Sequence, residues 1–262
     1  MIAVGVTGIG IAAPGLRDWE AARAVLAGRA PYVAGPLEHR APEALPPAER
    51  RRAGALTRLA LAVAQEAVAR AGVEASRLAS VFASADADAE NTHHICAALA
   101  TPAPEISPTR FHNSVQNAPS GYWTIATQAR APTSSINGLD EVFATGLLEA
   151  AAQAAVERRE VLLVAFDLPA PEPIFGLHPL GCGAAVALVL APDARGRRLA
   201  LSVAAGAAAT AVDLAPLERL RLDNPALRAL PLLAAIARPA PARVVMALDE
   251  ANALELAIDG AA

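Results

Sequence analysis

The chain of 262 residues contains no lysine, because all 22 of its basic residues are arginine. This absence excludes a Schiff-base lysine, the lysine of a phosphate-binding loop and any other catalytic lysine. The 26 acidic residues outnumber the basic ones and give a net charge of −4. A mildly acidic chain without a basic stripe is not expected to take nucleic acid as its main partner.

Cysteine is nearly absent, with Cys96 and Cys182 as the two examples. Two cysteines cannot form a disulfide framework or a four-cysteine metal site. We expect no metal and no cofactor, and the cysteine content fits a reduced, cytoplasmic compartment. The N-terminus has no charged region typical of a signal peptide, and no uncharged stretch spans a bilayer well, so we predict no transmembrane segment.

Aromatic residues are also scarce, at 3% of the chain, whereas 54% of the residues are hydrophobic and the mean hydropathy is +0.35. This composition excludes a disordered chain and predicts a large core built mostly from alanine, leucine and valine. The length is compatible with one or two domains.

Hydrophobic periodicity predicts alternating strands and helices and therefore an α/β fold. The predicted strands cover 2–11, 78–84, 133–136, 161–166, 184–190 and 199–204, and the predicted helices cover 18–27, 48–71, 86–101, part of 114–129, and 139–156. A further helix is predicted over 223–236, followed by a hairpin around Asp249-Glu250. We therefore divide the chain into a domain of residues 1–210 and a short extension of residues 211–262 packed on it.

Two local patterns in the first quarter of the chain resemble binding motifs only superficially. Gly8, Gly10 and Ala13 nearly fit the dinucleotide-binding fingerprint, but Pro14 follows at once and no acidic residue ends a strand about 20 residues later. We interpret them as a tight strand-to-loop turn. Arg50–Arg52 predict a solvated basic turn, with an acidic partner as the alternative.

The sulfur and imidazole groups do not form an evident site either. His93 and His94 are adjacent on a predicted helix and point about 100° apart, so they cannot easily share a metal with Cys96. We expect a structural or surface cluster. Cys182 precedes a buried strand and has His178 as its one nearby candidate partner, so we expect an inert buried thiol.

The order of residues along the chain resembles that of β-ketoacyl synthases. The opening VTGIGIAAPG and the following helix resemble the start of that family, and the matching positions are Val6, Thr7, Gly8, Gly10, Pro14, Trp19, Leu26 and Gly28. Ser107-Pro108, Asn117, Gly121 and Pro132 fit a later stretch of the family without a gap. The resemblance covers about residues 2–210. It implies a thiolase-like fold, a layered α/β/α domain whose C-terminal part is truncated.

Two departures from the family concern its chemistry. The resemblance places Asp140 where the synthases carry their nucleophilic cysteine, and no cysteine lies between Cys96 and Cys182. A condensing synthase needs a thiolate to hold the acyl chain, and a carboxylate would form a mixed anhydride instead. The family's two catalytic histidines are also missing, because the last histidine here is His178. No residue of this chain is therefore predicted to be catalytic, and the chain is not expected to be an enzyme on its own.

Asp140 itself has two interpretations. A carboxylate at the start of a helix can cap the free N–H groups and favour the positive end of the helix dipole. Alternatively, it mimics an acyl or malonyl carboxylate in a vestigial pocket.

The segment SPTRFHNSVQNAPSGYW and the tail DNPALRALPLLAAIA resemble short chain-length-factor-like proteins of aryl polyene and xanthomonadin-type pathways. The resemblance implies a subunit that pairs with a full-length β-ketoacyl synthase and shapes the acyl tunnel in polyketide or fatty-acid-like biosynthesis. The synthase would supply the chemistry, and acyl carrier protein would be engaged indirectly. The candidate tunnel or interface residues are Phe111, His112, Asn117, Tyr122, Trp123 and Asp140.

The sequence is also compatible with other interpretations. Phe111 and Trp123 would serve equally as packing residues, and Asn117 as a residue whose hydrogen bond fixes a loop. A stand-alone acyl-thioester hydrolase or decarboxylase would use Asp140 with His112 or His178. A homodimeric protein that binds an acyl chain or a carrier is the third alternative.

Overall fold

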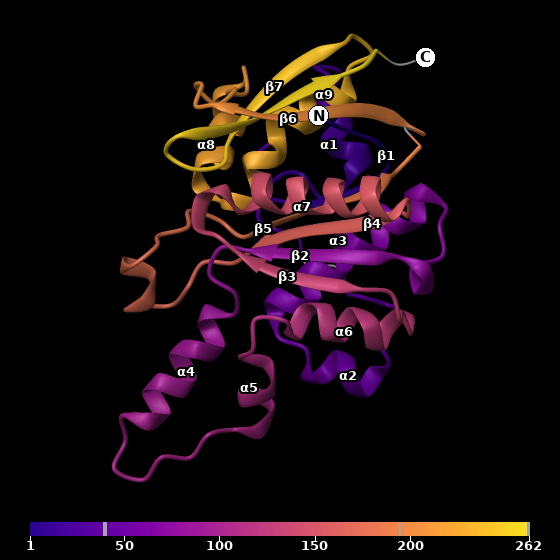
Figure 1. The fold of residues 1–262 in the computed structure, drawn as a ribbon. Helices are drawn as coiled ribbons and strands as arrows, with labels where there is room; N and C mark the ends of the chain where they lie inside the picture. The colour runs from indigo at the N-terminus through magenta and orange to yellow at the C-terminus, as the bar shows by residue number, and fades with distance from the viewer. Residues whose placement is uncertain (39–40, 194, 261–262) are drawn as a thin grey trace.

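The computed structural model describes residues 1–38, 41–193 and 195–260, and its centre is one sheet of eight strands (Figure 1). Along the sheet the strand order is β3-β2-β4-β5-β1-β6-β8-β7. The strands are β1 (Ile2–Ala12), β2 (Ala79–Ser84), β3 (Thr133–Asn137), β4 (Val161–Asp167), β5 (Ala184–Ala191), β6 (Arg197–Ala205), β7 (Ala242–Ala247) and β8 (Asn252–Ile258). Strands β3, β2 and β4 run parallel, and every other neighbouring pair is antiparallel.

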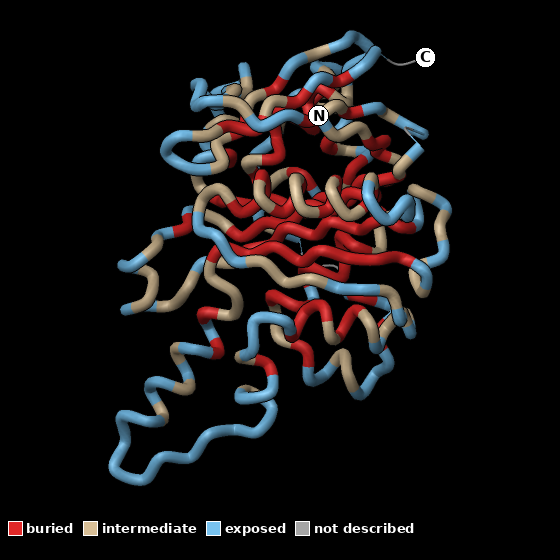
Figure 2. Tube along the Cα trace, viewed as in Figure 1, coloured by how far each residue is buried: buried red, intermediate tan, exposed pale blue. Residues whose placement is uncertain are grey.

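Helices cover both faces of the sheet, which confirms the predicted layered α/β/α class. The α-helices are α1 (Trp19–Leu26), α2 (Pro47–Arg52), α3 (Ala55–Ala71), α4 (Ala89–Leu99), α5 (Pro108–Asn113), α6 (Ala118–Thr127), α7 (Val142–Glu157), α8 (Ala215–Asp223) and α9 (Leu230–Ala237). Helix α7, with α1 and α9, packs on one face, and α3 with α6 packs on the other. Every residue of β2, β4 and β5 is buried between these layers (Figure 2).

Gly8 and Gly10 lie inside β1, and the predicted tight turn follows the strand at Pro14-Gly15, where Ala13 and Leu16 exchange backbone hydrogen bonds. A Cβ atom on Gly8 would lie 2.0 Å from the carbonyl oxygen of Ala67, and one on Gly10 would lie 2.1 Å from that of Val63. The two glycines are therefore required by the close approach of α3 to β1 and not by a turn or a ligand.

The predicted helix over 48–71 is two helices in the structure. Ala53 takes an extended conformation and Gly54 is the N-cap of α3, so the chain turns between α2 and α3. A Cβ atom on Gly54 would lie 3.1 Å from the Asp88 carboxylate, which leaves little room for another side chain there. The helical periodicity of the sequence continues across this break, because the break is set by tertiary packing.

The C-terminal extension continues the same sheet. Strand β8 pairs with β6 along Leu199–Ala205, and β7 pairs with β8 around the predicted hairpin turn. The helix predicted over 223–236 is interrupted. Asn224 caps a 3-10 helix, η4 (Pro225–Ala229), which leads into α9, and the preceding α8 was not predicted at all.

Helices α4 and α5 form an arm that projects from the body of the molecule (Figure 1). Only Ala89 and Asn91 of α4 are buried, and Asn113 is the buried residue of α5. Figure 2 shows the arm and the loop between its helices as mostly exposed. The arm is thus held to the body mainly at its base.

Candidate functional site

The carboxyl ends of the parallel strands β2, β3 and β4 lie at one edge of the sheet, because the three strands run in the same direction. Three aspartates follow these ends. Asp86 lies two residues beyond β2, Asp167 is the last residue of β4, and Asp140 lies in the 3-10 turn η2 (Leu139–Glu141) between β3 and α7. Ligands of open parallel sheets bind at this edge, which makes it the candidate site.

Asp167 is almost completely buried, with 1% of its surface exposed. Its Oδ1 atom accepts hydrogen bonds from the Ser84 hydroxyl (2.8 Å) and the Ala85 amide (2.7 Å), whereas Oδ2 has no partner among the described residues. Burial raises the pKa of this carboxyl to about 7, against the lowering effect of the two hydrogen bonds. Asp167 is therefore a carboxyl group close to its own midpoint of titration at neutral pH.

His178 is the centre of a charged cluster beside Asp167. Its Nδ1 atom lies 2.6 Å from Oδ2 of Asp86, and its Nε2 atom lies 3.6 Å from Oδ1 of Asp140. Burial by itself would lower the pKa of His178, but the hydrogen bond and charge of Asp86, with the charge of Asp140, outweigh it and raise that pKa. Arg228, from η4, lies 3.5 Å from the same Asp140 oxygen. The His178 imidazole and the Arg228 guanidinium thus both face the Asp140 carboxylate.

This arrangement limits the chemistry of the cluster. A general base needs a ring nitrogen that can reach water or substrate, and both nitrogens of His178 face carboxylates. The Ser84 hydroxyl donates a hydrogen bond to Asp167 and is not paired with His178. The geometry is that of an imidazole held between the carboxylates of two neighbouring loops.

A narrow cavity of about 120 Å³ adjoins the cluster between α7, η4 and β7. Asp140 and Arg228 line it together with Arg221, Thr210 and Met246. Arg221 is itself held by Glu218 at 2.6 Å. The cavity is too small for a drug-sized molecule, for which pockets are typically 300 Å³ or more.

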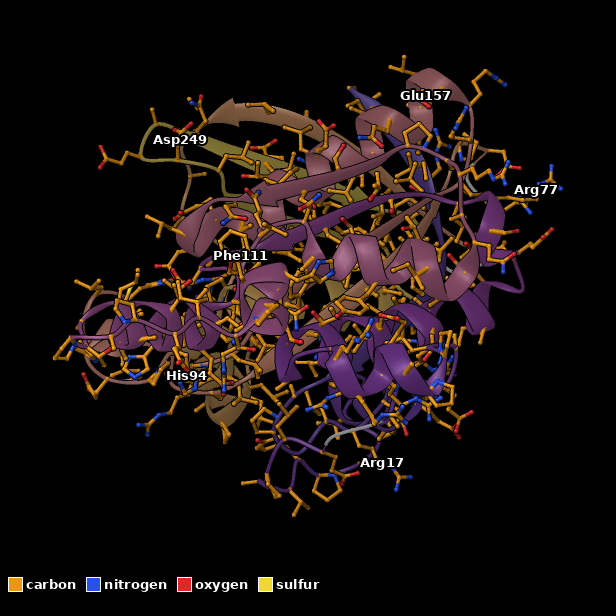
Figure 3. All side chains as sticks on the ribbon, turned by 90° about the horizontal axis from the view of Figure 1, so that it is seen from below. Arg17, Arg77, His94, Phe111, Glu157 and Asp249 are labelled. Carbon is orange, nitrogen blue, oxygen red and sulfur yellow. The ribbon has the colours of Figure 1, made fainter. Side chains whose placement is uncertain are left out.

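The remaining predicted site residues lie on α5 and α6, away from the charged cluster. Phe111 is 65% exposed on the projecting arm, on the same side of the molecule as His94 and opposite Arg77 (Figure 3). His112 is exposed and its ring packs edge-on against that of Tyr122, with the centroids 6.2 Å apart. Asn117 is exposed and its side chain makes no capping hydrogen bond to α6.

Tyr122 and Trp123 are buried, at 2% and 1% exposure, in the core layer formed with α3. The Tyr122 hydroxyl donates a hydrogen bond of 2.9 Å to Oδ1 of the buried Asn113. Tyr122 and Trp123 therefore pack in the core, whereas the side chains of Phe111 and His112 face solvent.

The sulfur and imidazole groups singled out in the sequence do not form one cluster, although the adjacent rings of His93 and His94 pack edge-on with their centroids 5.6 Å apart. Cys96 is exposed on α4, and burial together with the charge of Asp223 raises the pKa of Cys182 to about 11. His94 lies 3.7 Å from Glu90 on its own helix. Across residues 1–38, 41–193 and 195–260, no group of three or more His, Cys, Asp or Glu side chains has the arrangement of a metal site.

Asp86, Asp167 and Arg228 were not selected from the sequence. Asp86 and Asp167 do carry a signal, because each lies at or just after the carboxyl end of an apolar run that predicts a buried strand. Arg228 carries none, since its approach to Asp140 depends on how η4 packs against α7, and this contact is set by the tertiary fold.

Comparison with known families gives one match over most of the chain. Residues 19–244 match the family described as the N-terminal domain of β-ketoacyl synthase. No curated protein matches the chain significantly. Among the described residues, no helix is both long and apolar enough to cross a membrane.

Solved structures share the fold. A ketosynthase (ApeO) in complex with its chain length factor (ApeC) from Xenorhabdus doucetiae contains a chain with a TM-score of 0.74 and 23% identity, covering 98% of this chain and 100% of that one. The ishigamide ketosynthase/chain length factor has a TM-score of 0.73 and 16% sequence identity, with complete coverage of both chains. A chain of the complex AntDE:AntF has a TM-score of 0.75 and 11% sequence identity, with 99% of both chains covered. The chain is thus similar in structure to ketosynthases and chain length factors over its whole length.

Proposed function

The chain belongs to the β-ketoacyl synthase N-terminal domain family, and we propose that it is a non-catalytic chain-length-factor subunit of a β-ketoacyl synthase. It would pair with a full-length synthase and form one wall of the tunnel that holds the growing acyl chain. The similar structures from Xenorhabdus doucetiae and of the ishigamide system are ketosynthases with chain length factors, which supports this subunit type. By the same reasoning we propose a polyketide or aryl polyene type of product.

The observation that carries the proposal is the identity of the residue at the turn between β3 and α7. This residue is Asp140, which is faced by His178 and Arg228. The two cysteines lie elsewhere, on α4 and before β5. A thioester with the acyl chain cannot form on this carboxylate. A chain with this fold and this site is therefore suited to supporting a condensation that another subunit performs.

The edge of the sheet supports association with a partner. Within the described part of the chain β3 pairs only with β2, so its outer edge is open to a further strand. Gln116 is one side chain that bonds to this strand, at the carbonyl of Ser135. Large apolar side chains are exposed along the neighbouring segments, and they are Leu99, Ile106, Phe111, Val115, Ile125, Leu139 and Leu177. We propose that these side chains form the apolar face that contacts the partner.

The first test is co-expression with the full-length β-ketoacyl synthase encoded nearest to this chain, followed by size exclusion with mass detection. We expect a 1:1 complex whose condensing activity disappears when the synthase cysteine is mutated. Val115→Asp with Ile125→Asp should dissociate the complex, while Leu222→Asp, an equally exposed leucine on α8, should not. A self-dimer of the wild-type chain with no affinity for the synthase would instead favour a homodimeric binding protein.

The contact between His178 and Asp140 is the one observation that favours a stand-alone hydrolase or decarboxylase, as this alternative requires such a pair. The purified chain should be incubated with acyl and malonyl thioesters, alongside Asp140→Asn. We expect no turnover from either protein.

We also expect no condensation from Asp140→Cys alone, because no second histidine accompanies the new thiol. Condensation by that variant would refute the proposal.

A further inference from the structure

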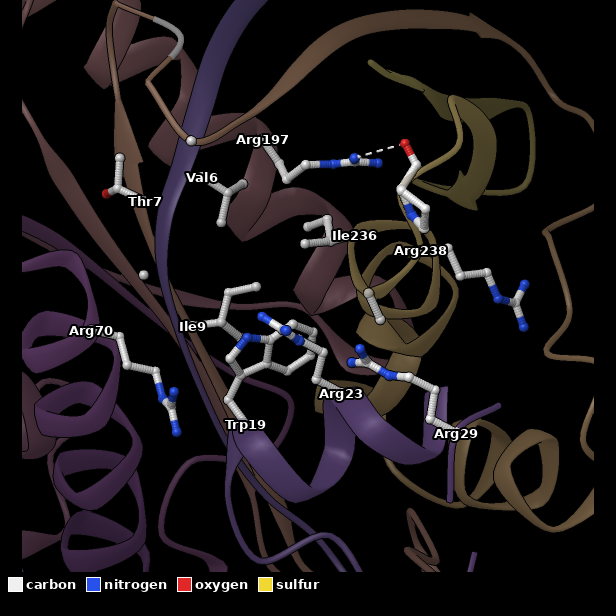
Figure 4. Close-up of a pocket in the computed structure, with 14 residues that line it drawn as sticks. Val6, Thr7, Ile9, Trp19, Arg23, Arg29, Arg70, Arg197, Ile236 and Arg238 are labelled. Carbon is white, nitrogen blue, oxygen red and sulfur yellow. Dashed lines mark hydrogen bonds between the residues drawn. The ribbon is translucent and has the colours of Figure 1, made fainter. Parts of the chain in front are cut away.

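A pocket of about 580 Å³ opens between α1, α9 and the strands β1 and β6 (Figure 4). Strand β1 lies four positions away from β3 in the sheet order, so the pocket is remote from the apolar face assigned to the partner. Its volume is in the range of small-molecule sites. Nothing in the proposed function uses this part of the molecule.

Arginine dominates the lining of this pocket. Five of the 14 lining residues are arginine and none is acidic. Because arginine makes up 22 of 262 residues, chance would place about one in such a lining. The side chains between the arginines are apolar and include Val6, Ile9, Trp19 and Ile236 (Figure 4). The pocket thus combines an apolar floor with a strongly positive rim.

Three of the five arginines already have protein partners. Arg70 pairs with Glu66 at 3.1 Å, and Arg238 lies 3.9 Å from Asp213. Arg197 donates hydrogen bonds to three backbone carbonyls at and just after the end of α9, so its guanidinium closes that helix. These three side chains shape the wall of the pocket.

Arg23 and Arg29 differ from the other three. Both are exposed and extend into the same space from α1 and the turn after it (Figure 4). Among the described residues no ion pair forms with either of them. Two neighbouring guanidinium groups without an acidic partner repel each other, and an anion between them would relieve that repulsion. Guanidinium groups also match the oxygens of a phosphate in paired hydrogen bonds.

A second, more apolar trough of about 390 Å³ continues from this pocket. Arg238 lines both, and Gly28 and Ala30, on either side of Arg29, line the trough. Its other walls include Val25, Leu214 and Leu217. An extended molecule could therefore place a charged end at the arginines and an apolar chain along the trough.

We propose that this pocket binds a soluble organic phosphate that carries an apolar chain. The phosphate lies between Arg23 and Arg29, and the chain lies against Leu214 in the trough. A phosphate dianion suits the site better than a carboxylate because two unpaired cations face it. The site is independent of the synthase partner, so the proposal stands or fails separately from the proposed function.

Octyl phosphate is the direct probe, used below its micelle concentration in isothermal titration calorimetry with the full chain. We expect it to bind about tenfold more tightly than inorganic phosphate, which lacks the chain, and than octyl glucoside, which lacks the charge. Arg23→Gln with Arg29→Gln should weaken octyl phosphate by about tenfold or more. The matched control is Arg51→Gln with Arg219→Gln, two exposed arginines outside the pocket, and it should bind like the wild type.

Leu214→Gln tests the trough separately. It should weaken octyl phosphate a few-fold and leave inorganic phosphate unchanged. All variants replace exposed or half-exposed side chains, and circular dichroism melts should confirm that they fold. Equal loss of binding in the Arg51→Gln/Arg219→Gln control would overturn the proposal. Binding to phosphatidic acid vesicles without any response to octyl phosphate would overturn it too, since the ligand would then be a membrane surface.

Discussion

Replacement of His178 by glutamine should destabilise the protein more at low pH than at high pH. In the wild type the imidazole lies 2.6 Å from Asp86 and 3.6 Å from Asp140, and these carboxylates raise its pKa above the ordinary value of about 6.5. A folded-state pKa above the unfolded one means that the stabilisation is complete below the unfolded pKa. It is lost as the pH rises through the folded pKa, because the imidazole then gives up its proton.

The size of the effect follows from the hydrogen bond. A hydrogen bond to a charged group contributes about 1.5–3 kcal/mol. The side chains of His178 and Asp86 are 23% and 24% exposed, and solvent screening reduces the contribution to about 1–2 kcal/mol. For a chain of this length each kcal/mol shifts the melting temperature by about 2–4 °C, so His178→Gln should lower it by roughly 2–8 °C at pH 5.5. At pH 8.5 the difference between variant and wild type should be smaller.

The contribution of Asp167 to the pH dependence of stability has to be separated from that of His178, because both decrease as the pH rises. Burial raises the pKa of its carboxyl to about 7, so folding favours the protonated form and stability declines between about pH 4 and pH 7. Thermal melts at pH 5.5, 7.0 and 8.5 of the wild type, His178→Gln, Asp167→Asn and the double variant resolve the two contributions. An equal lowering of the melting temperature by His178→Gln at all three pH values would refute the stabilising role of the charged cluster.

Two further predictions concern packing and thiol reactivity. Gly10→Ala should lower the free energy of unfolding by about 1–3 kcal/mol in urea titrations, because its Cβ would lie 2.1 Å from the Val63 carbonyl oxygen. Gly121→Ala, in a helix with nothing within 4 Å of the new Cβ, should be neutral or stabilise by up to about 1 kcal/mol, and equal losses would contradict the explanation. At pH 8 iodoacetamide should modify the exposed Cys96 and leave the half-buried Cys182, whose pKa is raised to about 11, nearly untouched. Peptide mass mapping of the native protein checks this, and equally fast labelling would be inconsistent with the raised pKa of Cys182.

Much of the fold could be predicted because its signals are local. The apolar runs that form β4 and β5 are fully buried strands, and Asp18 caps α1 as the sequence indicates, with its carboxylate accepting from the Ala21 amide at 2.8 Å. The errors lie where distant segments decide the conformation. The break between α2 and α3 and the role of Gly10 both depend on packing between elements, which periodicity does not contain.

The candidate site was predictable only in part for the same reason. The resemblance to β-ketoacyl synthases placed Asp140 at the turn before α7, where the structure has it. The sequence offers both His178 and His112 as its partner, and no sequence pattern distinguishes them. The choice between the two comes from the long loop before β5, which folds back onto the edge of the sheet.

The position of the first strand has a consequence for biosynthesis. Strand β1 is made before both of its neighbours, β5 and β6, and the hydroxyl of Thr7 reaches the carbonyl of Val189, 182 residues later. At about 5–20 residues per second, a ribosome takes roughly 10–40 s to deliver these neighbours. During that time an apolar strand has neither of its hydrogen-bonding partners, and its exposed edges can pair with another chain.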